Sequence, residues 1–416
     1  MPVTPSDFRE YDWRPVILGG DITAYSLVRT FYEAYRVKPI VANMSTSGPI
    51  ALSRLCDHLY YEGFDTEPVL VRALLEIGRQ YGAQAGKRLL VLGSGDWYVR
   101  MLVENKHVLS DYYVIPYIDR DLLDRIVLKD VFYGTLDELG IPYPRTFVYD
   151  VATDTPLDFD LGTPIVAKPA NSAKYHYASF PGKRKVFILD TADELKQVLA
   201  NVRTSSYDYK FLIQEFIPGD DTNMRVLTCY SDRDARVRFA SLGHTLLEEH
   251  VPSAIGNPCA IITERNDEIV AQATRFLEHI GYTGFSNFDL KYDPRDDTFK
   301  FFEINVRLGR SNYYVTAGGH NVAEWMVRDL LLDEAFDGMV VADREHLFTF
   351  VPKYVIWRFV RDEAMRNRAM HLYRTGAWSD PQRFGPDLTL RRRGYNALYL
   401  ANQARKFHRH LEPRGG

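Results

Sequence analysis

Cysteine is scarce in this sequence. The 416 residues include only Cys56, Cys229 and Cys259, which lie far apart and form no CxxC pair. Structural zinc sites and disulfide frameworks both need closely patterned cysteines, so neither is expected. We expect three buried or partly buried free thiols in a reducing compartment.

Long apolar runs are also missing. No stretch reaches the ~18–20 uninterrupted apolar residues that a membrane span requires. Residues 1–13 contain acidic side chains and lack the apolar segment of a secretory signal. The expected location is therefore the cytoplasm.

The sequence also has no persuasive Ser/His/Asp or Cys/His set for nucleophilic catalysis.

Net charge is small, at −4, but it is unevenly distributed. Residues 340–416 contain 15 Lys+Arg and 7 Asp+Glu, a net charge of +8, so residues 1–339 carry −12. Such asymmetry is compatible with a solvated basic helix, a nucleic-acid contact or a membrane-surface contact. We favour a helix that packs on the protein or rests near the anionic inner face of the membrane. No nucleic-acid partner is expected, and an oligomer is compatible with the sequence.

Residues 1–119 alternate between apolar runs and amphipathic stretches. Because strands separated by helices form parallel sheets covered on both faces, this pattern predicts an α/β domain. Glycine-rich turns, Gly19-Gly20-Asp21 and 93–96, follow two of the strands and suggest ligand approach at their carboxyl ends. The first is not a complete GxGxxG, so a tight turn is favoured over dinucleotide binding. The expected strands are 14–18, 39–42, 88–92 and 112–117, and the expected helices are 22–35, 69–81 and 97–109.

Three further segments are predicted after residue 119. Residues 120–222 begin with a helix over 122–139 that Gly140 ends, and they contain a capping box formed by Thr191 and Glu194. Residues 223–341 finish with a hairpin around a turn at 293–297. Residues 342–416 form a basic, mostly helical extension. The other expected strands are 147–149, 164–168, 186–189, 211–216, 224–230, 237–242, 285–292 and 298–306, and a helix is expected over 268–280.

Acidic and amide side chains gather on the two strands of that hairpin. Glu303 and Asn305 are two residues apart, so their side chains leave the same face of the strand. If Asp289 on the partner strand lies opposite, three oxygen donors converge, as Mg²⁺ requires. Arg307 continues the same face and can bind a phosphate or carboxylate through paired hydrogen bonds.

The alternative for this hairpin is a solvated edge with one surface ion pair. We disfavour that interpretation because the hairpin looks buried on its other face, as its apolar residues indicate: Phe285, Phe288, Phe301, Phe302 and Ile304.

Two lysines and a strand end precede the hairpin. Lys168 ends an apolar strand, and since an unpaired buried cation is costly, it must reach solvent or a fixed anion such as a nucleotide phosphate. Lys129 lies on the helix before Gly140. Either lysine alone could be an ordinary surface cation. The strand end at 214–221 exposes backbone groups that suit an adenine edge and acids that suit ribose hydroxyls, although a solvated turn is the plainer interpretation.

The order of these lysines, the strand end and the hairpin residues along the chain resembles that of the ATP-grasp ligases, and the resemblance spans positions 10–340. Among these enzymes, bacterial D-aspartate ligases and related carboxylate–amine ligases are the most similar. The resemblance is carried by Lys129, Lys168, Gln214–Asp221, Asp289, Glu303-Ile304-Asn305 and Arg307, and by GSGDWYVRMLVENK, YYVIPYIDRDLLDRIVLKDVFYG, AKPANSAKYHY, GKRKVF and MRVLTCYSD.

The resemblance implies a fold and a set of roles. The chain would have a parallel-sheet pre-ATP-grasp domain at 1–119, nucleotide-binding and metal-binding ATP-grasp subdomains at 120–222 and 223–341, and the extension at 342–416. Residues 170–185 would cover the phosphates, although Gly182 is their only glycine. The implied roles are phosphate binding by Lys129, Lys168 and Ser172; adenine contacts by Gln214, Glu215, Phe216 and Ile217; ribose binding by Asp221; two Mg²⁺ ions, with Mn²⁺ as an alternative, at Asp289, Glu303 and Asn305; and catalysis by Arg307 and Lys168.

The implied reaction has two steps. A carboxylate attacks the γ-phosphorus of ATP to give an acyl phosphate, and an amine then displaces phosphate. The resemblance implies D-aspartate, through its β-carboxylate, and the side-chain amine of a peptidoglycan precursor. Another amino acid or small peptide is the alternative, as is a silent ATP-binding module, which the intact hairpin residues disfavour. His244, Glu248 and His250 are candidates for the base or substrate contacts, but satisfied or surface side chains are the plainer interpretation.

Overall fold

The computed structural model describes residues 3–251 and 254–412, without the side chains of Ser172, Ala173 and His176. The chain forms two compact units. Unit 1 consists of Met1–Arg120, Met224–Asn287 and Asn305–Gly416, and unit 2 of Asp121–Asn223 and Phe288–Ile304. Because the chain enters unit 2 twice, most of the predicted hairpin lies in the same unit as the residues that follow position 120. The four-segment division expected from the sequence stays a prediction.

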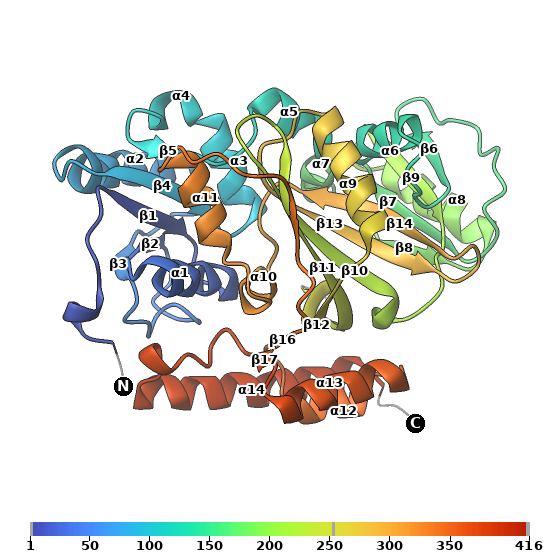
Figure 1. Ribbon diagram of the computed structural model, residues 1–416. Helices are drawn as coiled ribbons and strands as arrows, with labels where there is room; N and C mark the ends of the chain where they lie inside the picture. Colours follow the sequence, from blue (N-terminus) through green and yellow to red (C-terminus); the bar gives the residue numbers. More distant parts are fainter. Residues whose placement is uncertain (1–2, 252–253, 413–416) are drawn as a thin grey trace. The chain divides into compact units, whose positions relative to one another are not determined.

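The first sheet of unit 1 is parallel, as predicted, with strand order β3-β2-β1-β4-β5. Its central strands are almost entirely buried because helices cover both faces (Figure 1). Asp21 caps α1 by accepting a hydrogen bond from the Ala24 amide at 3.1 Å. The elements are η1 Pro5–Asp7, β1 Trp13–Leu18, α1 Ile22–Tyr35, β2 Ile40–Asn43, β3 Asp57–Tyr60, α2 Glu67–Ile77, η2 Gly78–Ala83, β4 Arg88–Gly93, α3 Asp96–Glu104, α4 Lys106–Leu109 and β5 Tyr113–Val114.

Three expected elements near this sheet differ in the structure. The helix expected over 97–109 is interrupted at Asn105, whose side-chain amide donates to the Met101 carbonyl at 3.0 Å and competes with the helix backbone. The strand expected over 112–117 has only two residues, since Pro116 has no amide to donate. The helix expected over 122–139 is two helices, because the Lys129 amide donates to the Ala170 carbonyl at 3.2 Å instead of continuing the first helix.

A second, largely antiparallel sheet completes unit 1. Within it β10, β11, β12 and β16 are neighbours in that order, β17 lies beside β16, and β15 lies beside β11. Strand β12 is absent from the sequence-based prediction, and β11 is longer than predicted. The elements are β10 Met224–Ser231, β11 Val237–Glu249, β12 Asn257–Glu264, α9 Asp267–His279, α10 Tyr313–Ala317, α11 Val322–Leu330, β15 Val340–Val341, β16 Leu347–Thr349, α12 Lys353–Phe359, α13 Glu363–Thr375, β17 Trp378–Ser379, η4 Gly385–Asp387 and α14 Leu390–His410.

A buried polar cluster attaches the C-terminal segment to the first sheet. Asp387 and Arg392 are both fully buried and lie 3.4 Å apart. The Asp387 carboxylate also accepts from the Tyr25 hydroxyl at 3.0 Å, the Ser53 hydroxyl at 2.9 Å and the Arg54 amide at 2.8 Å. The guanidinium of Arg392 lies 3.9 Å from the Tyr25 ring centroid. The cluster pairs two buried charges that would each be costly to bury alone, and Nε and Nη2 of Arg392 have no hydrogen-bond partner among the described residues.

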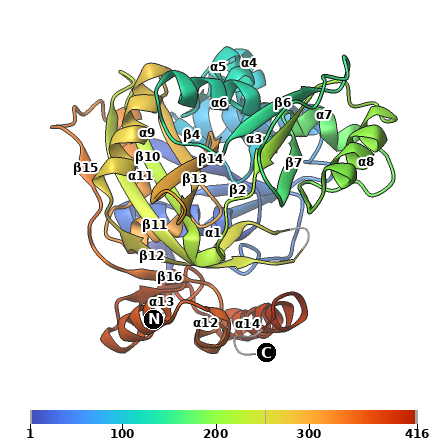
Figure 2. The ribbon, with the colours of Figure 1, turned by 90° about the vertical axis from the view of Figure 1, so that its right-hand side faces the viewer.

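Unit 2 is built on the antiparallel sheet β6-β9-β7-β8 (Figure 2). The predicted capping box is present, because the Thr191 hydroxyl accepts from the Glu194 amide and the Glu194 carboxylate accepts from the Thr191 amide, both at 3.2 Å. The elements are α5 Arg120–Ile126, α6 Lys129–Glu138, β6 Thr146–Asp150, β7 Ile165–Pro169, α7 Ser172–Tyr177, β8 Phe187–Leu189, α8 Ala192–Arg203, β9 Lys210–Glu215, η3 Asp221–Asn223 and β14 Thr298–Asn305, with β13 Gly284–Asp293 running into it from unit 1.

Truncation of Asp387 tests the buried cluster. Asp387→Ala leaves the Arg392 guanidinium buried without its carboxylate, and we expect the free energy of unfolding, measured by urea denaturation, to fall by about 3–5 kcal/mol. Asp337→Ala, which changes an exposed aspartate of the same unit, is the matched control. Equal stability of the two variants would contradict the structural role of the cluster.

Candidate functional site

A half-buried ion pair joins the start of α6 to β14 in unit 2. The Lys129 ammonium donates to the Glu303 carboxylate, and their side chains are 17% and 37% exposed. The Lys129 charge lowers the pKa of Glu303 to about 2, more than burial raises it. Burial alone would lower the pKa of Lys129, but Glu303, Tyr133 and Asp289 together raise it. Both groups are therefore ionised at neutral pH.

Lys168, at the end of β7, lies beside this pair without a carboxylate of its own among the described residues. Its ammonium donates to the Tyr133 hydroxyl at 3.1 Å and lies 5.6 Å and 5.7 Å from the ring centroids of Tyr133 and Phe302. Burial and the nearby Lys129 charge lower the pKa of Lys168 to about 7. An anion bound here would restore the stability of its charged form, so the electrostatics favour an anionic ligand.

The predicted metal donors lie on the two hairpin strands. Asp289 belongs to β13 and is half-buried, and its charge contributes to the electrostatic field at Lys129. Glu303 and Asn305 are two residues apart on β14 and leave the same face of that strand. In the described part of the chain, no three His, Cys, Asp or Glu side chains cluster in a way that could hold a metal ion. The predicted set has two carboxylates, and its third donor is an amide oxygen.

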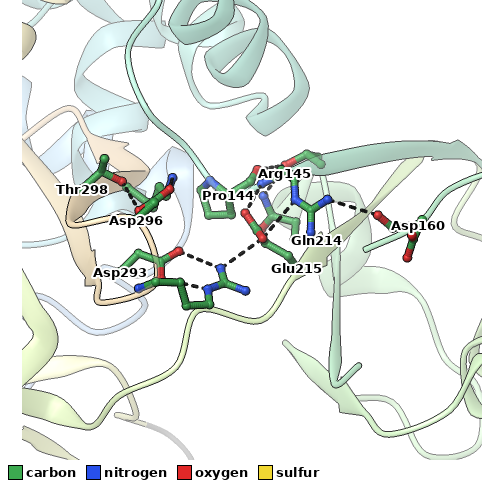
Figure 3. Close-up of polar contacts among 11 residues, drawn as sticks. Pro144, Arg145, Asp160, Gln214, Glu215, Asp293, Asp296 and Thr298 are labelled. Carbon is green, nitrogen blue, oxygen red and sulfur yellow. Dashed lines mark hydrogen bonds and ion pairs between the residues drawn. The ribbon is translucent and has the colours of Figure 1, made fainter. Parts of the chain in front are cut away.

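Glu215, at the end of β9, is held by two arginines, as Figure 3 shows. Its carboxylate is 6% exposed and accepts from Arg145 at 3.1 Å and from Arg295 at 3.0 Å. Arg295 also bonds Asp293 in the turn of the hairpin, at 2.7 Å. The contact therefore fixes the hairpin turn against the end of β9. Because the Glu215 side chain is engaged in this way, any ligand contact that it makes is expected through its backbone.

The remaining residues predicted to contact adenine and ribose follow β9. The Gln214 amide is buried and donates to the Thr146 hydroxyl at 2.7 Å. Ile217 is buried, whereas Phe216 and Asp221 are half-buried. Ser172 is the first residue of α7, and its side chain lies outside the described residues. The expected covering segment, 170–185, thus includes a short helix that the sequence reading did not predict.

Lys291 is a site residue that the sequence reasoning missed. Its ammonium donates to the carbonyls of Ile217 and Gly219 at 2.9 and 3.0 Å, and it lies 5.5 Å from the Phe216 ring centroid. It therefore links the hairpin to the segment after β9. Lys291 follows Asp289 by two residues, so the side chains of both leave the same face of the strand. This spacing could have identified Lys291 from the sequence.

In unit 1, the carboxyl ends of β1 and β4 form a topological switch point. The chain proceeds from β1 toward β2 on one side and later places β4 on the other, and ligands of open α/β sheets bind at such points. The residues there are small: a side chain at Gly19 would lie 2.0 Å from the Ser94 hydroxyl oxygen, and Gly19 has a positive φ of 115°.

Two arginines are held by acids at the start of the helices that follow these strands. Arg307 bonds Asp96, the first residue of α3, through two nitrogens at 2.9 and 3.0 Å. Arg310 lies 3.6 Å from Asp21, the cap of α1, and 3.1 Å from the buried Glu249. Two guanidinium groups therefore lie at the switch point of unit 1, where they can bind a carboxylate or phosphoryl group.

Sequence comparisons find relatives over nearly the whole chain. The carbamoyl-phosphate synthase L chain, ATP binding domain family matches residues 187–328. A D-aspartate ligase of Enterococcus faecium (strain Aus0004) is 34% identical over 390 residues, which cover 91% of this chain and 92% of that protein.

Solved structures share the fold at much lower identity. An L-amino acid ligase of Bacillus licheniformis matches with a TM-score of 0.55 at 14% identity, over 78% of this chain and 75% of that one. The biotin carboxylase domain of the Hydrogenobacter thermophilus 2-oxoglutarate carboxylase, crystallised with MgADP, ADP and bicarbonate, matches with a TM-score of 0.57 at 11% identity, over 79% and 72%.

The resemblance inferred from the sequence is confirmed by these matches. The α/β fold with its N-terminal parallel sheet agrees with the ATP-grasp neighbours, and the identity to the Enterococcus protein extends along almost the full length of both chains. This chain belongs to the D-aspartate ligase family of ATP-grasp carboxylate–amine ligases.

Proposed function

We propose that this protein uses ATP to join the β-carboxylate of D-aspartate to the side-chain amine of a peptidoglycan precursor in the cytoplasm. The similarity to the Enterococcus D-aspartate ligase supports the substrate. The observation that carries the reaction class is the group formed by Lys129, Lys168 and Glu303, where Lys129 is paired with the carboxylate and Lys168 is not. A nucleotide phosphate would supply Lys168 with the negative charge that it lacks.

The residues of unit 2 have separate tasks in this proposal. Lys129 and Lys168 bind the phosphates, together with Ser172, and Lys168 stabilises the charge of the transferring phosphoryl group. The adenine lies against Gln214, Phe216 and Ile217 and the backbone of Glu215, and Asp221 binds the ribose. Lys291 keeps the Ile217–Gly219 segment in place through its two hydrogen bonds.

The donor chemistry of the hairpin fits magnesium. Asp289, Glu303 and Asn305 offer only hard oxygen atoms, and the Glu303 carboxylate stays ionised at neutral pH. We assign two Mg²⁺ ions, which Mn²⁺ could replace, to these residues. When bound, the ions would neutralise phosphate charge and polarise the phosphoryl oxygens. MgADP in the structurally similar biotin carboxylase domain supports the choice of ion.

We assign the contacts of the carboxylate substrate to Arg307. Arg307 is positioned by one hydrogen bond and a second ion-pair contact to Asp96, and its guanidinium can stabilise an acyl phosphate and the tetrahedral species that the amine forms from it. In this scheme no protein nucleophile is required, since the phosphoryl group itself activates the carboxylate. Positioning and charge neutralisation account for the catalysis.

A panel of amino acids tests the substrate. ADP release is measured with ATP, Mg²⁺, a lysine-containing peptidoglycan precursor, and D-aspartate, L-aspartate, D-alanine or D-asparagine in turn. We expect turnover that needs both D-aspartate and the amine. Turnover with another amino acid would assign a different ligase of the same class, as the L-amino acid ligase neighbour illustrates. No amine-dependent turnover with any amino acid would leave a silent ATP-binding module.

Removal of the Lys168 charge tests its role in phosphoryl transfer. Lys168→Met should lower kcat by at least about 100-fold, because a preorganised charged donor to the transferring group is lost. Lys196→Met, at an exposed position of α8, is the control and should keep full activity. Activity of Lys168→Met within about twofold of the control would refute the assignment.

Glu303→Gln separates metal binding from nucleotide binding. The loss of a carboxylate donor should raise the Kd for MgADP, measured by calorimetry, at least about tenfold. In EDTA, the Kd for ADP should fall instead, because Lys129 is released from Glu303 and a negative charge near the phosphates disappears. An equal loss of affinity with and without metal would show that Glu303 acts only on the fold.

A further inference from the structure

Helix α14 is unusually basic. Its 21 residues include six Lys or Arg and no Asp or Glu. Three of the arginines, 391–393, occupy the first turn, where the positive end of the helix dipole disfavours cations. Arg392 is buried against Asp387, but Arg391 and Arg393 are exposed. The stability of the helix therefore does not explain these exposed cations.

The exposed side of α14 combines cationic and apolar residues. At 100° per residue, Arg391, Leu398, Arg405 and Arg409 lie along one side of the helix. Leu398 is 74% exposed at the middle of that side, and Leu390 is 87% exposed at the start of the helix. The buried positions face the opposite direction and are Arg392, Asn396, Gln403 and Phe407.

Helix α12 extends this surface. It packs beside α14 in the same unit, as Figures 1 and 2 show. The Tyr354 hydroxyl and the His408 imidazole nitrogen are 3.1 Å apart, and their rings stack at 6.0 Å. Tyr354 is 45% exposed, and Trp357, one helical turn further on, is 51% exposed. We name the exposed side chains Tyr354, Trp357, Leu390, Arg391, Leu398, Arg405 and Arg409 the α12–α14 face.

The cations of this face are not neutralised by the protein. In the described part of the chain, Arg391, Arg405 and Arg409 form no ion pair, and Arg405 bonds only the neutral side chain of Asn402 at 3.1 Å. Other arginines of unit 1 are paired with acids, for example Arg328 with Glu334 at 2.7 Å. The face thus presents uncompensated positive charge beside exposed apolar side chains.

The chemistry of the face decides between three kinds of partner. A second copy meeting the same face through a two-fold axis would place arginines against arginines. The phosphates of a nucleic acid would pair with the arginines, but Leu398 and Leu390 would be left without an apolar environment. An anionic lipid surface accommodates both, since the cations meet the headgroups and the apolar and aromatic side chains enter the interface.

We propose that the α12–α14 face is a docking surface for an anionic lipid membrane. The cationic ends of Arg391, Arg405 and Arg409 contact lipid headgroups while Leu398, Leu390 and Trp357 insert among them. The inference is independent of the substrate assigned above, because the face lies on the C-terminal helices and includes no residue with a proposed role in the reaction.

Vesicle co-sedimentation of the full chain tests this surface. Phosphatidylcholine vesicles are compared with vesicles that contain about 30% phosphatidylglycerol, and we expect binding to the anionic vesicles only. Arg391→Gln/Arg405→Gln should lower the partition coefficient about 30-fold, since each cation near an anionic surface contributes about fivefold. Trp357→Ser/Leu398→Ser should also lower it, by about tenfold. Arg72→Gln/Arg79→Gln, at exposed positions of the same unit, should bind like the unmodified protein.

Three results would overturn the proposal. They are equal binding of the unmodified protein to both vesicles, sedimentation of Arg391→Gln/Arg405→Gln equal to that of the Arg72→Gln/Arg79→Gln control, and binding to polyuridylate but not to vesicles. ADP release with soluble substrates should be the same in all variants, which shows that each is folded.

Discussion

The half-buried pair of Lys129 and Glu303 is the contact on which the candidate site depends. It joins the first residue of α6 to a strand 174 positions later, and it brings the metal-donor hairpin to the lysines that precede it in the chain. Neither charge could be buried alone without a large desolvation cost. The pairing therefore fixes the hairpin and explains why Lys168, the second cation, is left short of negative charge.

The same arrangement recurs at the other charged positions. Arg307 is held by Asp96, Arg310 by Glu249 and Asp21, and Glu215 by two arginines. The charges of Arg307, Arg310 and Glu215 are thus paired before any ligand arrives, whereas Lys168, within the described residues, bonds only the neutral Tyr133 hydroxyl. When a phosphate, carboxylate or metal ion binds, the charged side chain exchanges its ionic partner in the protein for the ligand. Such exchange keeps the side chains preorganised and avoids leaving a charge uncompensated in a buried site.

Local patterns made a large part of this fold and reaction class predictable. Three patterns depend only on near neighbours: the i, i+2 spacing of Glu303 and Asn305, the alternation of strands and helices, and the capping box at Thr191. From such patterns the parallel sheet, the capping box and the family were predicted correctly. The contacts of Asp387 with Tyr25, Ser53 and Arg54 and the contact of Arg307 with Asp96 could not be predicted, because each joins residues more than 200 positions apart. The division of the helix before Lys129 was missed for the same reason, since its cause is a hydrogen bond to Ala170.

The buried cluster around Asp387 has a consequence for how the chain is made. Ser53, whose hydroxyl bonds Asp387, leaves the ribosome 334 residues before its partner. Since domains begin to fold N-terminal first during synthesis, the loop around Ser53 stays without its hydrogen bonds to Asp387 while nearly all of the chain is added. This loop, Pro49–Arg54, acquires its last hydrogen bonds only as α14 emerges. A stop codon a few dozen codons early in the messenger RNA would therefore leave the Pro49–Arg54 loop without its partners, near the beginning of the protein and far from the missing residues.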